Sequence, residues 1–159
     1  MTKPGSFDQE SPTPAWAGPL RAAGRWLLAT FLLIAGIGHF GSAEEFLAQV
    51  PTWMPAPQLV VALSGVVEIC LAVALVGVRP WRAQVGWVVA AFFVLVFPGN
   101  ISQLVTQTDA FGLDSDLARG VRLLFQPVLI VWALWCTGAW ASWRSRPRKS
   151  GAELATPAE

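Results

Sequence analysis

The chain has few charged residues and few of the residues that build metal and catalytic sites. Of its 159 residues, 13% are charged, one is histidine, two are cysteine and none is tyrosine. Soluble domains carry about 25% charged residues, so this deficit indicates an integral membrane protein. A single histidine excludes a multi-histidine metal or haem site within one chain. The net charge of +1, with no basic stripe in a folded region, gives no sign of a nucleic-acid partner.

Recognisable catalytic motifs are lacking too. No serine lies in a Gly-x-Ser-x-Gly turn, no glycine-rich phosphate loop occurs, and Cys70 and Cys136 stand apart rather than as a Cys-x-x-Cys pair. The sequence therefore predicts no catalytic residue, no metal site and no certain cofactor. It leaves open whether the protein is an enzyme or at most a non-catalytic subunit of one.

The chain contains instead four long apolar runs, over about residues 22–40, 57–78, 83–104 and 117–140. Each is long enough to cross a hydrocarbon core of about 30 Å as a helix. We predict an all-α, integral membrane four-helix bundle over residues 21–143. A Pro/Gly/Ser-rich tail (1–20) and a basic, then polar tail (144–159) are predicted to be disordered. A cleaved signal peptide is a competing interpretation of the first run, because small residues follow it at 41–43.

The distribution of lysine and arginine predicts the orientation. One side of the membrane would hold nine basic residues: Lys3, Arg21, Arg25, Arg79, Arg82, Arg144, Arg146, Arg148 and Lys149. The other side would hold two arginines and five acidic residues: Arg119, Arg122, Glu44, Glu45, Asp109, Asp114 and Asp116. The positive-inside rule then predicts that both termini are cytoplasmic.

Proline modifies the third predicted span. Pro98 and Gly99 lie within it, and should kink or locally unwind the helix. The backbone carbonyls released by such a kink must be satisfied by neighbouring polar groups or water.

Glu68 is the most unusual residue of the membrane region, because it lies near the middle of the second apolar run. Ionisable groups at such depth usually face a bundle interior or a wet cavity, together with a partner. The other spans contribute His39, Asn100, Arg122 and Gln126 to the same outer half. We predict that Glu68 pairs with Arg122, and that the other three supply hydrogen bonds in a candidate ligand-binding site.

Three interpretations of these polar residues remain open. They could join the helices and fix their register without any ligand. They could line a pocket for a lipophilic small molecule or a docking site for a redox partner protein. They could form a proton or ion path, although transporters generally use more spans or repeats than four helices supply. A homo-oligomer is compatible with each interpretation.

Five short motifs in order resemble the DoxX/DoxX-like family of small bacterial membrane proteins. In chain order the motifs are Gly36-Ile-Gly-His39-Phe40, Val50-Pro-Thr-Trp-Met-Pro55, Ser64-Gly-Val-Val-Glu68, Phe97-Pro-Gly-Asn100 and Arg122-Leu-Leu-Phe-Gln126. The resemblance covers roughly residues 25–140. It implies a four-span bundle in the bacterial cytoplasmic (inner) membrane, and a link to quinone-dependent sulfur oxidation or to membrane complexes of redox homeostasis. Quinone is accordingly the cofactor or ligand class that it favours.

Overall fold

The computed structural model describes residues 17–145, which form seven helices and their connections. In chain order the helices are α1 (Ala17–Gly41), α2 (Ala43–Leu47), α3 (Pro57–Gly77), α4 (Arg82–Leu95), α5 (Phe97–Val105), α6 (Asp116–Thr137) and α7 (Ala139–Arg144). Within these residues the only β feature is an isolated bridge between Ala110 and Leu113. The all-α prediction is confirmed for the described part of the chain.

Four helical segments are long and apolar enough to cross a membrane: Ala17–Gly41, Pro57–Gly77, Arg82–Val105 and Asp116–Thr137. The third combines α4 and α5. All four coincide with the predicted spans to within a few residues, so the prediction of a helical, multi-pass membrane bundle is confirmed at this level.

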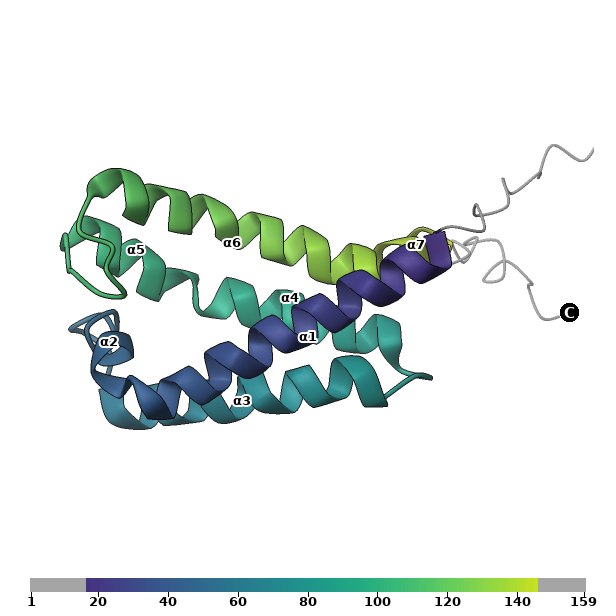
Figure 1. The fold of residues 1–159 in the computed structure, drawn as a ribbon, viewed down its shortest axis with the longest axis horizontal. Coiled ribbons are helices and arrows are strands. Elements are labelled where there is room, and N and C mark those ends of the chain that lie inside the picture. The colour runs from purple at the N-terminus through teal and green to yellow at the C-terminus, as the bar shows by residue number, and fades with distance from the viewer. Residues whose placement is uncertain (1–16, 146–159) are drawn as a thin grey trace, which may run out of the picture.

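The helices form an elongated bundle in which two packed pairs lie side by side (Figure 1). Helix α1 packs along α3, and α6 packs along α4 and α5. Helix α2 and the loop over residues 106–115 lie at one end of the bundle, which we call the loop end. The first turns of α1, the α3–α4 turn and α7 lie at the other end, which we call the basic end.

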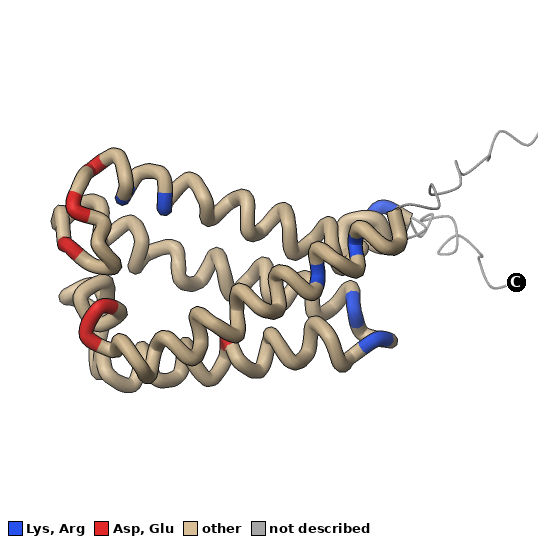
Figure 2. Tube along the Cα trace, in the orientation of Figure 1, with Lys and Arg blue, Asp and Glu red and all other residues tan. Residues whose placement is uncertain are grey.

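The two ends differ in charge (Figure 2). Arginines gather at the basic end: Arg21, Arg25, Arg79, Arg82 and Arg144. At the loop end lie all the acidic residues of the described chain except Glu68, together with Arg119 and Arg122. Residues predicted to share one side of the membrane therefore lie at one end of the bundle.

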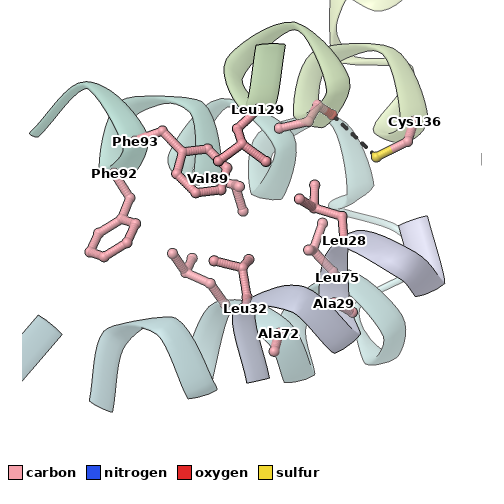
Figure 3. Close-up of a cluster of buried hydrophobic side chains, with 12 residues drawn as sticks. Leu28, Ala29, Leu32, Ala72, Leu75, Val89, Phe92, Phe93, Leu129 and Cys136 are labelled. Carbon is pink, nitrogen blue, oxygen red and sulfur yellow. Dashed lines mark hydrogen bonds between the residues drawn. The ribbon is translucent and has the colours of Figure 1, made fainter. Parts of the chain in front are cut away.

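A cluster of buried apolar side chains fills much of the half of the bundle nearer the basic end (Figure 3). Leu28 and Leu32 of α1, Val89 of α4 and Ala133 of α6 are each fully buried at 0% exposure. Because lipid is as apolar as leucine, such contacts stabilise a membrane bundle through close packing rather than through removal from water. This core holds the four spans together and leaves the polar residues to the other half.

Helix ends depart from the prediction at two places. Residues 17–20 were predicted to be disordered, but they form the first turn of α1, because Gly18 and Pro19 occupy positions whose backbone N–H groups need no helical partner. The fourth span ends at Thr137, where Gly138 adopts a left-handed φ of 73°, and α7 continues after this break. The rest of the two predicted tails, residues 1–16 and 146–159, lies outside the described residues.

Candidate functional site

His39 and Glu68 meet where α1 and α3 approach each other most closely. The approach depends on two glycines, Gly36 and Gly65. A Cβ placed on Gly65 would lie 2.7 Å from the Cβ of His39 and 3.0 Å from the carbonyl oxygen of Gly36. A Cβ on Gly36 would lie 2.9 Å from the carbonyl oxygen of Gly65. Each functional side chain follows its glycine by three residues, so the close packing brings the two side chains together.

The His39–Glu68 pair is buried and incompletely hydrogen bonded. Nε2 of His39 lies 3.4 Å from Oε2 of Glu68, and the two side chains are 9% and 11% exposed. Two buried atoms of the pair, His39 Nδ1 and Glu68 Oε2, have no hydrogen-bond partner among the described residues. Most buried polar side-chain atoms do have such a partner, so these two require an explanation.

A second polar group connects α5 and α6, and each of its three residues is hydrogen bonded to another member. Asn100 donates from Nδ2 to Oε1 of Gln126 at 2.8 Å, and Gln126 donates from Nε2 to the carbonyl oxygen of Phe93 at 2.8 Å. Arg122 donates from Nε to Oδ1 of Asn100 at 3.2 Å. Asn100 and Gln126 are 9% and 5% exposed, whereas Arg122 is half-buried. We call these three residues the amide network.

The amide network satisfies a carbonyl at the predicted kink. The third span breaks between Leu95 and Phe97, with Pro98 in the first turn of α5, as the sequence predicts. Gln126 of α6 donates to the Phe93 carbonyl just before this break. The expectation that a polar neighbour compensates the kink is therefore confirmed.

The structure does not pair Glu68 with Arg122. Instead Nη2 of Arg122 donates to Oε1 of Gln49 at the loop end, at 2.8 Å. The ionisable side chain next to Glu68 is that of His39. The predicted pairing is wrong because a long arginine side chain extends toward the nearer interface, whereas pairing with Glu68 would draw it toward the bundle centre.

A chain of aromatic contacts joins the two polar groups across the loop end. The ring of His39 stacks on Phe46 of α2 with centroids 3.7 Å apart, and Phe46 meets the edge of Phe111 at 4.8 Å. The guanidinium carbon of Arg122 lies 4.9 Å from the Phe111 ring centroid. The backbone N–H of Phe111 donates to Oε2 of Glu45 at 2.6 Å. Helix α2 and the 106–115 loop thereby form a cover over both groups.

Sequence reasoning did not assign roles to several residues of this end. Gln103, only 1% exposed, reaches the carbonyl oxygens of Thr108 and Ala110 at 3.4 Å each. Arg119 is 5% exposed and pairs with Asp109 and with Asp116. These contacts hold the loop in place. Gln49 and Phe111 lie in connecting segments, where helical spacing offered no signal for their contacts.

The two most prominent hollows of the described structure lie away from the predicted site residues. These hollows, of about 560 and 330 Å³, lie along α6 toward the basic end, and none of the five predicted residues lines them. Nor do residues 17–145 contain a group of three or more His, Cys, Asp or Glu side chains that could hold a metal ion.

Comparison with protein families places the chain in one of them. The sequence pattern of the family described as Domain of unknown function (DUF8561) matches residues 28–137, which is most of the chain. The protein therefore belongs to this family, and the match includes all five predicted site residues. No curated protein and no solved structure matches the chain.

Proposed function

We propose that this protein binds a lipophilic small molecule with a hydrogen-bonding head group, of the quinone class, at the His39–Glu68 pair. It would serve as a membrane subunit of a redox-linked complex, as the resemblance to DoxX-like proteins also suggests. The electrons would come from a partner protein. The residues of the site would bind and orient the head group.

One observation carries the proposal: within residues 17–145, Nδ1 of His39 and Oε2 of Glu68 are buried and accept or donate no hydrogen bond, although that oxygen lies 3.4 Å from Nε2 of His39, whereas every member of the nearby amide network is hydrogen bonded. An unpartnered buried polar group costs about 1–3 kcal/mol. A ligand that supplied both missing hydrogen bonds would recover that cost. Binding of such a ligand would therefore lower the free energy of the site.

Quinone-class head groups fit the chemistry of the pair. His39 can donate to a carbonyl oxygen, and the Glu68 carboxylate can accept from a hydroxyl, so both the oxidised and the reduced head group find a partner. An isoprenoid tail would remain in the lipid.

The ligand would reach the His39–Glu68 pair through the cover formed by α2 and the 106–115 loop. The direct contacts between α2 and the loop are exposed: the Glu45–Phe111 hydrogen bond lies at the surface, and Phe111 is 39% exposed. Local opening of segments with few buried contacts has a low free-energy cost. Displacement of Phe46 and Phe111 would uncover His39 and Glu68 without disturbing the apolar core.

A structural role is the second candidate, and the amide network favours it. Asn100, Arg122 and Gln126 satisfy one another and a kink carbonyl, as expected of residues that only hold helices together. Under this alternative the protein would be an assembly subunit with no ligand.

We further propose that the protein lies in the bacterial cytoplasmic membrane with both termini in the cytoplasm. The gathering of five arginines at the basic end supports this orientation. In a variant without native cysteines, Cys placed at Asp114 should react with an impermeant reagent added outside intact cells, and Cys placed at Ser145 should not. The reverse pattern would invert the topology.

Binding to the purified protein tests the ligand proposal. We expect the quinone affinity of Glu68→Gln and of His39→Leu to fall about tenfold or more, since a hydrogen bond to a charged group contributes about 1.5–3 kcal/mol. Cys70→Ser, an exposed change on the same helix, is the matched control and should bind normally. Unchanged affinity in both site variants would refute the proposal.

A further inference from the structure

A continuous apolar groove follows α6 on the outside of the bundle. Its first part, about 560 Å³, is lined by Pro127, Val128, Val131, Trp132 and Trp135. Its second part, about 330 Å³, shares Val131 and Trp135 with the first, and continues toward the basic end past Gly138 and Trp140. From Pro127 to Trp135 the groove covers about 12 Å of helix, at about 1.5 Å per residue.

The floor of the groove is fixed by contacts between α6 and α1. Trp132 donates from its indole nitrogen to the carbonyl oxygen of Gly24 at 3.1 Å. A Cβ on Gly24 would lie 2.9 Å from the ring of Trp135. The rings of Trp132 and Trp135 thus pack against Gly24, and the hollow beside them is part of the α1–α6 contact.

The groove ends at positive charge. Arg21 of α1 lines its second part, and a Cβ on Gly138 would lie 4.0 Å from the Arg21 guanidinium. Nε of Arg21 is buried and has no hydrogen-bond partner among residues 17–145. Arg144 lies over the ring of Trp140, which also lines the groove, with 5.7 Å between its guanidinium carbon and the ring centroid.

No carboxylate of the described chain neutralises this end. The six acidic residues between 17 and 145 are Glu44, Glu45, Glu68, Asp109, Asp114 and Asp116, and none lies at the basic end (Figure 2). An apolar groove that leads to an arginine with no acidic partner among residues 17–145 complements one kind of membrane molecule, which has an acyl chain joined to an anionic head group.

We propose that this groove is a binding site for an anionic phospholipid. The acyl chain lies along Val128, Val131 and Trp135, and the phosphate accepts hydrogen bonds from Arg21, whose planar guanidinium suits it. Arg144 contributes charge beside Trp140. This site is separate from the His39–Glu68 pair and does not depend on the ligand proposed there.

Native mass spectrometry of the full-length protein tests the proposal, with phosphatidylglycerol and phosphatidylcholine of identical acyl chains as probes. We expect phosphatidylglycerol to bind about fivefold or more tightly, since one arginine near an anionic lipid contributes about 1 kcal/mol. Arg21→Gln should remove this preference. Arg79→Gln removes an exposed charge from the same end without touching the groove, and should retain it.

A second pair of variants tests the groove itself. Val128→Trp would fill it from a 53% exposed position and should weaken both lipids, whereas Val66→Trp, a 49% exposed change on α3, should weaken neither. Equal binding of the two lipids to the wild-type protein would overturn the proposal. Equal losses of the phosphatidylglycerol preference in Arg21→Gln and Arg79→Gln would also overturn it. A wild-type dimer that Val128→Trp dissociates would do the same, because the groove would then bind a second copy of the chain.

Discussion

The two polar groups of the loop-end half are both largely buried but differ in how completely they are hydrogen bonded. The amide network of Asn100, Arg122 and Gln126 satisfies its members and the carbonyl of Phe93. In the described part of the chain, the His39–Glu68 pair leaves a nitrogen and an oxygen without hydrogen-bond partners. Since both groups are buried in one small bundle, the difference supports the proposed division of roles, in which the complete network holds helices and the incomplete pair binds the ligand.

The largest expected effect comes from separating the helices that carry the incomplete pair. Gly65→Val would place a side chain against His39 and the Gly36 carbonyl, and we expect a loss of about 3 kcal/mol or more in the free energy of unfolding. Thermal unfolding in detergent measures it. Gly77→Val, at a helix position with no atom within 4 Å, is the control and should change stability little. Equal stability of the two variants would show that the α1–α3 contact is looser than described.

A smaller loss is expected from breaking the complete network. Gln126→Leu leaves the Asn100 amide and the Phe93 carbonyl without partners, at a cost of about 1–3 kcal/mol in unfolding free energy. Gln84→Leu makes the same chemical change at an exposed position of α4 and should stay within about 0.5 kcal/mol of wild type. If Gln126→Leu lowers the unfolding free energy no more than Gln84→Leu does, the amide network does not hold the helices together.

The smallest loss is expected at the contact that joins the two groups. Phe111→Leu removes the ring between Phe46 and Arg122, and should cost about 0.5–1 kcal/mol, the usual value of an exposed cation–π contact. Phe31→Leu, a 40% exposed change on α1, serves as the control in the same unfolding assay. A loss above about 2 kcal/mol would mean that the two groups behave as one network.

The sequence predicted the spans well, because apolar length and proline position depend on local composition. It also placed all five candidate residues in the loop-end half. It failed on the partner of Glu68, since charge alone suggested Arg122, whereas the glycine contact between α1 and α3 selects His39. Contacts of Gln49, Phe46 and Phe111 depend on how α2 and the 106–115 loop fold over the bundle. Helical periodicity carries no information on that arrangement.

A parallel measurement on Glu68→Gln and Gln126→Leu tests the division of roles most directly, with quinone affinity and unfolding free energy determined for both. We predict that Glu68→Gln loses about tenfold or more in affinity while its stability stays within about 1 kcal/mol of wild type. Gln126→Leu should lose stability and retain affinity once folded. A Glu68→Gln protein that binds quinone normally but unfolds as readily as Gln126→Leu would contradict the account, because both polar groups would then be structural.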